Sequence, residues 1–286
     1  MTDKKLIEQL NNICEFTHEM DGDYCIAISF HDENRFGSTI RRHPLKREII
    51  QLVAKFPKLK QINLRKSKLG HIPDMTSTEL EHIDISCNDL ENVPKWIMNQ
   101  KSLLSLNLGS NRIETVPDLS DMPLEILKLH KNVGIRNLPE FGSGLKLLNL
   151  FILPHITEIP KRVFDLPLLE AFTFGVTKAS HLPSLASLTK LRWLTLSVNR
   201  FEELPEDICS LEKLEGLRLA KNKLKKLPKH FGNLGLKVLT LYGNEITELP
   251  ESFFDLNLEK LNLALNPLND KKRVIDSFTN IDFFRI

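Results

Sequence analysis

The stretch LEGLRLAKNKLKKLP, residues 214–228, decides the fold of this chain. Leu217 and Leu219 flank one polar residue, the pattern of a short strand whose alternate side chains face opposite ways. Asn222 follows at the bend, where a side-chain amide can satisfy backbone groups that the turn leaves unpaired. Pro228 ends the stretch and turns the chain away, because proline cannot extend a hydrogen-bonded strand.

The same pattern recurs along most of the chain with a spacing of 21 to 24 residues. The segments LRWLTLSVNRFEELP (191–205) and LKVLTLYGNEITELP (236–250) match it throughout. One repeat cannot bury its own leucines, so neighbouring repeats must stack against each other. Ten repeats are expected to start at Leu59, Leu80, Leu103, Leu124, Leu145, Leu169, Leu191, Leu214, Leu236 and Leu258.

Asparagine occupies the bend of seven repeats and predicts a ladder of stacked amides. These asparagines are Asn88, Asn111, Asn132, Asn199, Asn222, Asn244 and Asn266. Ser67 and Thr177 take the same position and can replace part of the hydrogen bonding, whereas Leu153 cannot. After Asn132 and after Leu153 the next apolar residues come one position late, which indicates a widened turn in both repeats.

These repeats resemble the leucine-rich repeat family, and they cover about residues 57 to 268. The extension LPEDICSLEKL (204–214) is similar to intracellular Ras-interacting-type and bacterial members of that family. The resemblance implies an α/β fold, a right-handed solenoid or horseshoe of about ten repeats with a parallel sheet on its concave side and helical caps. It also implies a non-enzymatic module for protein–protein interaction.

Three segments are expected. An N-terminal cap spans 1–56, with a helix over 3–17, a strand over 24–30 that joins the sheet, and a helix that Pro44 opens; a small independent module is the alternative. The repeats span 57–268. A C-terminal cap spans 269–286, where Asn269 or Asp270 begins a helix and the apolar end IDFFRI packs over the last repeat or forms a partner-binding tail.

Composition argues against several classes of function. A net charge of +2 gives no reason to expect nucleic-acid binding, and no run of 18 apolar residues predicts a membrane span. The start of the chain has no apolar core typical of a secretory signal. Four scattered cysteines favour free thiols and a reducing compartment, so we expect a cytoplasmic protein, or one delivered into a host cell if it is a bacterial effector.

Catalytic chemistry is weakly represented. His82, Asp84 and Cys87 lie close in sequence, and their types are those of a metal site or a thiol–histidine pair, but a single repeat offers no closed set of ligands. No glycine-rich phosphate loop or nucleophile elbow occurs in the sequence. We therefore predict no enzyme activity, no cofactor and no metal.

The concave face is the expected binding surface. The stretch LKLLNLF (145–151) is apolar on both sides of its strand, which a core alone does not require. Either Leu147 and Phe151 face a partner, or the irregular turn folds these side chains into the core, or a terminal segment covers them. The residues predicted to contact a protein or peptide partner are Ile126, Lys128, His130, Leu147, Phe151, Trp193, Arg218, Val238 and Tyr242.

Two further interpretations stay open at this stage. The chain can be the substrate-recognition fragment of a larger ligase, or a bacterial effector or immunity-type protein that acts in a complex. A downstream catalytic domain would distinguish the first of these from a free-standing module. The sequence specifies neither the partner nor the oligomeric state.

Overall fold

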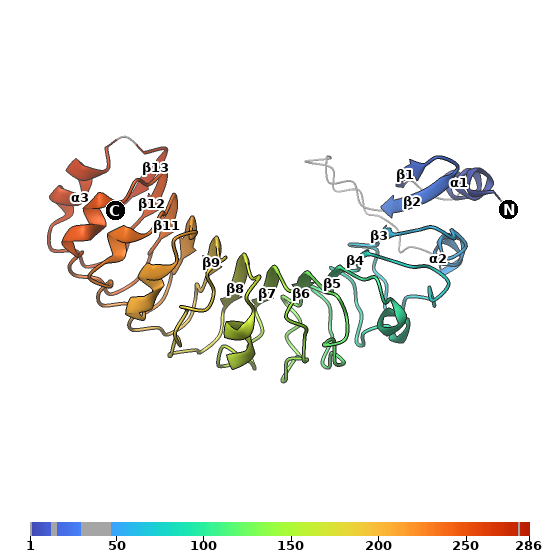
Figure 1. Cartoon of the computed structure of the whole chain (residues 1–286), viewed down its shortest axis with the longest axis horizontal. Coiled ribbons are helices and arrows are strands. Elements are labelled where there is room, and N and C mark those ends of the chain that lie inside the picture. The colour runs from blue at the N-terminus through green and yellow to red at the C-terminus, as the bar shows by residue number, and fades with distance from the viewer. Residues whose placement is uncertain (1, 13–15, 30–46, 280) are drawn as a thin grey trace. The chain divides into compact units, whose positions relative to one another are not determined.

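The computed structural model describes residues 2–12, 16–29, 47–279 and 281–286. The chain divides into two compact units, Met1–Gly142 and Ser143–Ile286. In each unit the strands stand side by side along one side of the coils, and the 3₁₀ helices lie on the other (Figure 1). This is the arrangement of a leucine-rich-repeat solenoid, as the periodicity predicts.

The first unit begins with a hairpin that extends the sheet. Strands β1 and β2 pair antiparallel, β2 runs parallel to β3, and each following strand up to β6 is parallel to the one before it. The elements are α1 (Asp3–Asn11), β1 (Thr17–Asp21), β2 (Tyr24–Ser29), α2 (Arg47–Val53), β3 (Gln61–Asn63), β4 (His82–Asp84), η1 (Lys95–Asn99), β5 (Ser105–Asn107) and β6 (Ile126–Lys128).

The second unit is a run of parallel strands with one short helix near its end. Its elements are β7 (Leu147–Phe151), η2 (Lys161–Asp165), β8 (Ala171–Gly175), β9 (Trp193–Thr195), η3 (Glu206–Ser210), β10 (Gly216–Arg218), η4 (Phe231–Asn233), β11 (Val238–Thr240), η5 (Glu251–Asp255), β12 (Lys260–Asn262), α3 (Lys271–Ser277) and β13 (Phe283–Arg285).

The leucines of each coil form the core. In the coil that begins at Leu214, the side chains of Leu214, Leu217, Leu219 and Leu224 are all fully buried. Full burial of one such side chain stabilises the folded chain by roughly 1.5 to 3 kcal/mol, so the repeated leucines supply the main favourable term. The middle residue of each short strand therefore points inward, and the residues on either side of it point out.

The asparagine ladder has the predicted role. Asn111 donates from Nδ2 to the carbonyl oxygens of Leu108 at 2.9 Å and Ile85 at 3.0 Å, and its Oδ1 accepts from the Leu90 amide at 3.2 Å. One side chain thus satisfies buried backbone groups of its own coil and of the preceding one. The residue before each ladder position is left-handed, with φ between 56° and 67°, because the backbone must bend sharply there.

Thr177 takes over part of the hydrogen bonding of a ladder asparagine, as predicted. Thr177 accepts from the Ala179 amide through Oγ1 at 3.1 Å and donates to Asn199 Oδ1 at 2.7 Å. In the coils of Asn132 and Leu153 a hydrogen bond closes an extra turn, from the Ile135 amide to the Asn132 carbonyl and from the Ile156 amide to the Leu153 carbonyl. The widened turns are confirmed.

Near the N-terminal end of the sheet, α1 contacts both β2 and α2. Leu6, Ile7 and Leu10 of α1 are buried, and the Asp3 carboxylate accepts a hydrogen bond of 2.8 Å from the Cys25 amide of β2. The helix expected over 3–17 ends at Asn11, and Thr17 already begins β1. The predicted helix start at Pro44 lies outside the described residues.

The C-terminal end differs from the expectation in one respect. Asp270 caps α3, because its carboxylate accepts from the Arg273 amide at 2.9 Å. Phe278 packs edge-on against Phe253, with ring centroids 5.7 Å apart, and so covers the last coil. The segment IDFFRI does not lie over the repeat: its residues 283–285 form β13, which pairs parallel with β12 and extends the sheet.

Candidate functional site: the strand face

Four positions of each coil form the surface that we call the strand face. Counted from the first residue of the strand, they are positions 1, 3, 5 and 6. Position 6 is the left-handed residue. In the coil of β9 these positions hold Trp193, Thr195, Ser197 and Val198. Strand spacing of about 4.8 Å sets the distance between equivalent positions of adjacent coils.

Six of the predicted contact residues lie on the strand face of the second unit. Trp193 is 38% exposed and Arg218 is exposed, while Leu147, Phe151, Val238 and Tyr242 are half-buried. Trp193 pairs with Gly216 in the ladder, and Gly216 pairs with Val238, so the indole ring and the valine flank a glycine.

Trp193 lies flat on the neighbouring strand. A Cβ atom placed on Gly216 would come within 2.1 Å of Cε3 and 2.2 Å of Cζ3 of the Trp193 ring. Only glycine leaves room for this contact, and Gly216 is buried beneath the ring. One face of the indole therefore packs against β10, and the rest of the side chain faces solvent.

The Phe151 ring of β7 likewise packs over a glycine of the next strand, Gly175 of β8. A Cβ atom on Gly175 of β8 would lie 2.9 Å from Cε2 of the Phe151 ring and 2.2 Å from the Ser197 carbonyl oxygen. Leu147 and Phe151 are thus half-buried against neighbouring coils instead of being folded into the core. The structure thus contradicts the interpretation of LKLLNLF in which the irregular turn folds these side chains into the core.

Three β-branched or apolar residues continue this surface at the left-handed positions. Ile152, Val176 and Val198 have φ values of 59°, 58° and 62°, where β-branched side chains are strained. Val198 is 36% exposed. Three adjacent coils thus present apolar side chains at a position where glycine or asparagine would cost less.

Cations accompany the aromatic rings. The Arg218 guanidinium carbon lies 5.6 Å from the centroid of the Trp193 ring, and the Lys221 ammonium nitrogen lies 6.0 Å from that of Tyr242. At these distances the attraction between cation and ring is weak in water, at roughly 0.5 to 1 kcal/mol. The rings and the cations therefore remain available to another molecule.

The other three predicted residues belong to the first unit. Ile126 and Lys128 are the outward residues of β6 and are half-buried. The His130 ring lies over Gly109 of the preceding coil, where a Cβ atom would come within 2.1 Å of Cε1. Burial lowers the pKa of His130, and Lys128 and Lys131 lower it further, so the imidazole is neutral near neutral pH.

The comparisons with known proteins agree with this geometry. Residues 162–281 match the family model of the leucine-rich repeat region. A leucine-rich-repeat protein of Leptospira interrogans is 30% identical over 82% of this chain, and the two structures superpose with a TM-score of 0.73. The chain is a leucine-rich-repeat protein. This fold suggests a protein-interaction module.

Two other relatives of this leucine-rich-repeat protein cover less of its sequence. Toll-like receptor 2 type-1 of Gallus gallus is 27% identical over 189 residues, which are 62% of this chain and 22% of the receptor. The effector YopM of Yersinia pestis is 24% identical, covers 74% of this chain and 56% of its own, and has a TM-score of 0.58; it shows the fold alone. The chain spans 62% of the Leptospira protein and about a fifth of the receptor.

Asp84, one of the side chains with potential chemistry, takes part in a hydrogen bond between neighbouring coils. Asp84 accepts from Asn107 Nδ2 at 2.9 Å and from the Ser86 hydroxyl at 2.6 Å. Burial raises the pKa of Cys25 and of Cys209 to about 11, and nearby carboxylates add to the effect, so both thiols stay protonated. Within the described residues no three His, Cys, Asp or Glu side chains gather as metal ligands.

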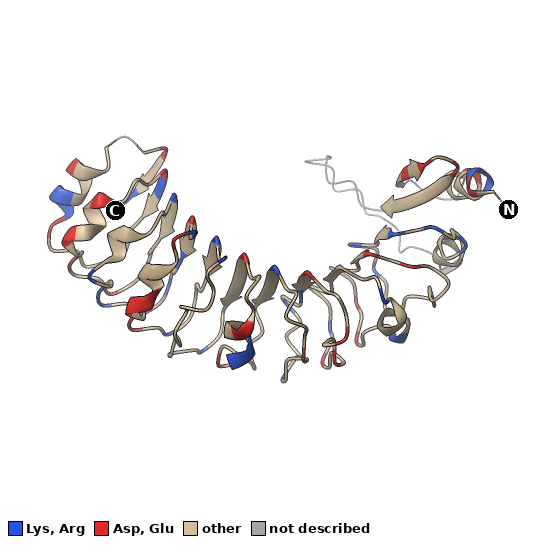
Figure 2. Cartoon of the chain, in the orientation of Figure 1, with Lys and Arg blue, Asp and Glu red and all other residues tan. Residues whose placement is uncertain are grey.

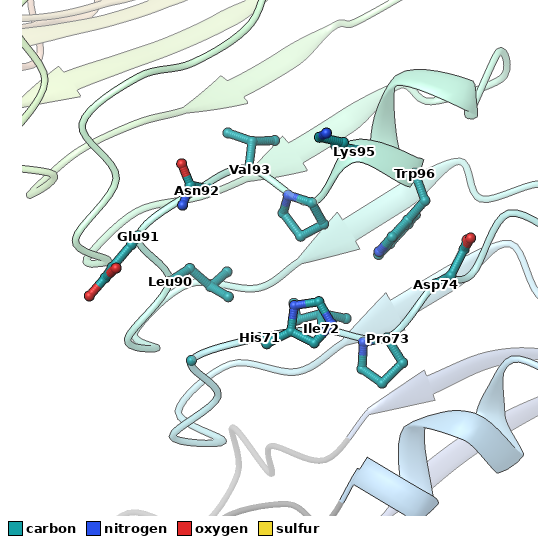
Figure 3. A pocket seen from close by; sticks show the side chains of 12 residues that line it. His71, Ile72, Pro73, Asp74, Leu90, Glu91, Asn92, Val93, Lys95 and Trp96 are labelled. Carbon is teal, nitrogen blue, oxygen red and sulfur yellow. The ribbon is translucent and has the colours of Figure 1, made fainter.

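A cavity of about 530 Å³ lies away from the strand face, on the loops that follow β3 and β4 (Figure 3). His71, Ile72, Pro73 and Asp74 form one wall, and the segment 90–96 forms the other. The Asp74 carboxylate already accepts hydrogen bonds from the Thr76 amide and hydroxyl, which lower its pKa. Trp96 also lines the cavity, and its indole N–H is buried without a hydrogen-bond partner among the described residues.

No described helix is both long enough and apolar enough to cross a bilayer. Sequence patterns gave no functional role to Gly175 and Gly216, which make room for the rings, or to the cations Lys221, Lys260 and Arg285. The glycines had a detectable signal, because each takes the same repeat position as the ring in the adjacent coil. The positions of these three cations on the strand face follow from the same strand register.

Proposed function

We propose that this leucine-rich-repeat protein is a non-enzymatic recognition module that binds a protein or a peptide on the concave surface formed by its strands. The single observation that carries the proposal is Trp193, which is 38% exposed and packed flat over Gly216. An indole held in one orientation loses little conformational entropy when a partner covers it.

The other anchors support the same function. Tyr242 and Phe151 are half-buried, and Phe151 has its own glycine beneath it. Tryptophan and tyrosine are the residue types that most often dominate binding energies at interfaces. Arg218 and, in the first unit, Lys128 and His130 are proposed to orient polar groups of the partner.

The test is affinity capture from a lysate of the source organism. Replacing Trp193→Ala together with Tyr242→Ala should abolish capture of the partner, while the circular dichroism spectrum stays that of the native fold and the variant still unfolds in one cooperative transition, at a lower midpoint because the packing of both rings is lost. Tyr24→Ala is the matched control, because Tyr24 is also an exposed aromatic, at 42%, but lies on β2 in the first unit. Undiminished capture by the double variant would refute the proposal.

We also propose that the protein works in a reducing compartment, the cytoplasm or the interior of a host cell. The thiols of Cys25, Cys87 and Cys209 are free, which supports this assignment. Cys14 lies outside the described residues. The segment boundaries 1–56, 57–268 and 269–286 likewise stay a proposal, supported by the helices at both ends of the repeats.

A further inference from the structure

The strand face of the second unit carries charge of one sign. Its four positions over β7 to β13 hold no aspartate and no glutamate. They hold four cations, all exposed: Arg218, Lys221, Lys260 and Arg285.

This asymmetry is local. Both signs of charge occur throughout the second unit (Figure 2). The residues just before β7 to β12 alternate in sign and sum to zero: Lys146, Glu170, Arg192, Glu215, Lys237 and Glu259. The excess of positive charge is therefore a property of the strand face and not of the unit as a whole.

The cations of the strand face are also free of acidic partners. Elsewhere in the unit Arg192 pairs with Glu215 at 2.8 Å, and Arg273 pairs with Glu251 at 2.6 Å. Among the residues that the structure describes, no carboxylate forms an ion pair with Arg218, Lys221, Lys260 or Arg285. Their hydrogen-bond donors are thus directed at solvent or at a ligand.

Three of the four cations lie beside an aromatic ring. Arg218 accompanies Trp193 and Lys221 accompanies Tyr242, as described above, and the Arg285 guanidinium carbon lies 5.1 Å from the Phe283 ring centroid. Each pair combines an apolar surface with a charge-assisted donor. A partner's side chain that is complementary to one such pair would place carbon atoms against the ring and a carboxylate against the cation.

We propose that the strand face from β9 to β13 binds an acidic, extended polypeptide segment that interleaves aspartate or glutamate with apolar side chains. This rests on the proposed function and specifies the partner of that same surface. Four intervals of about 4.8 Å separate β9 from β13, a span of roughly 20 Å. An extended segment of about six residues covers that distance.

A polypeptide fits this surface better than a nucleic acid or a lipid headgroup. Binding to a phosphate backbone draws on many cations in a row, and its affinity comes mostly from charge. Here the four cations lie among aromatic and aliphatic side chains. A peptide can place a carboxylate side chain at each cation and an apolar side chain at each apolar position. Single-stranded oligonucleotides and anionic vesicles are therefore used as competing probes.

The experiment is selection of short random peptides displayed on phage against the immobilised native chain. Selected peptides should be enriched in aspartate and glutamate together with apolar residues. Synthetic copies should bind about tenfold more weakly to the variant Arg218→Gln/Lys221→Gln/Arg285→Gln, and more weakly to the native chain at high salt. The matched control, Arg192→Gln/Lys225→Gln/Arg273→Gln, removes the same charge from paired positions and should bind as the native chain does.

The outcomes separate this inference from the function on which it rests. Peptides without acidic enrichment that still require Trp193 would overturn the inference and leave the proposed function standing. No peptide selected by the native chain over Trp193→Ala/Tyr242→Ala would count against both. Preferential binding of poly-dT or of phosphatidylserine vesicles, lost in the strand-face variant, would replace the acidic segment with another anion and overturn the inference.

Discussion

Replacing Gly216→Ala should lift the Trp193 ring from the sheet. The new Cβ atom would lie about 2 Å from two ring carbons, far inside van der Waals contact, whereas the backbone of Gly216 is not in a left-handed conformation that would disfavour alanine. The ring must therefore swing towards solvent, since the strand cannot move without breaking its ladder to β9 and β11.

The magnitude follows from the area that the ring covers. A tryptophan side chain offers roughly 250 Å² of surface, and with 38% of the residue exposed roughly 150 Å² is covered, worth about 4 kcal/mol at ~25 cal/mol per Å². If about half of that contact is with β10, its loss costs about 2 kcal/mol. Alanine in a strand recovers about 0.5 kcal/mol relative to glycine, so the net loss is about 1.5 kcal/mol.

Urea unfolding of a double-mutant cycle measures this coupling. In a Trp193→Ala background the change Gly216→Ala should be neutral or slightly stabilising, because the ring that it displaces is absent. Gly235→Ala is the control, because its Cβ atom would meet the Glu212 carbonyl oxygen at 3.5 Å, an ordinary contact. An equal loss in the two backgrounds would refute the description of Trp193 as packed over Gly216.

Three further predictions concern single buried or half-buried side chains. Asn222→Leu should destabilise the protein by about 3 kcal/mol in urea, because it leaves three buried backbone groups without partners; a loss under about 1 kcal/mol would contradict the ladder. Burial and the neighbouring lysines lower the pKa of His130 in the folded chain, so the unfolded chain binds a proton at this residue more readily. The free energy of unfolding should therefore be highest above the ordinary histidine pKa of 6.5 and should decrease as the pH falls below it. From about pH 7.5 to about pH 5.5 the unfolding midpoint should fall more for the native chain than for His130→Phe, and parallel curves would contradict this. Cys25, with its pKa raised to about 11, should resist iodoacetamide in the folded protein and react after unfolding, as mass spectrometry can show; fast labelling of the native chain would be inconsistent with its burial.

The repeat phase placed the strands correctly because it depends on one robust feature, the burial of the middle strand residue. Leu217 and Leu239 each stand between two outward residues, and the same alternation holds in every coil. The phase even revealed the widened turns, since a late apolar residue needs an extra residue in the bend. Strand β1 was not predicted, because its sequence THEMD is mostly exposed and carries no alternation of apolar residues. Strand β13 was taken for a covering segment, since a short apolar end fits either arrangement.

The strand face was predictable as a set of positions but not as a surface. Register alone assigned Trp193, Arg218 and Tyr242 to it, because outward positions follow directly from the buried ones. The direction of each ring depends on which neighbour leaves room, and that is decided by Gly175 and Gly216 in the adjacent coils. The pairing of cations with rings depends on side-chain reach across strands, which periodicity does not encode.

Fluorescence of Trp193 tests the central claim most directly. The chain has two tryptophans, so Trp96→Phe leaves Trp193 as the single reporter. Adding a peptide selected on the native chain should shift the Trp193 emission to shorter wavelength and protect it from quenching by acrylamide, because the exposed part of the indole becomes covered. Binding that leaves the emission maximum and the quenching of Trp193 unchanged would contradict the assignment of the strand face as the binding surface.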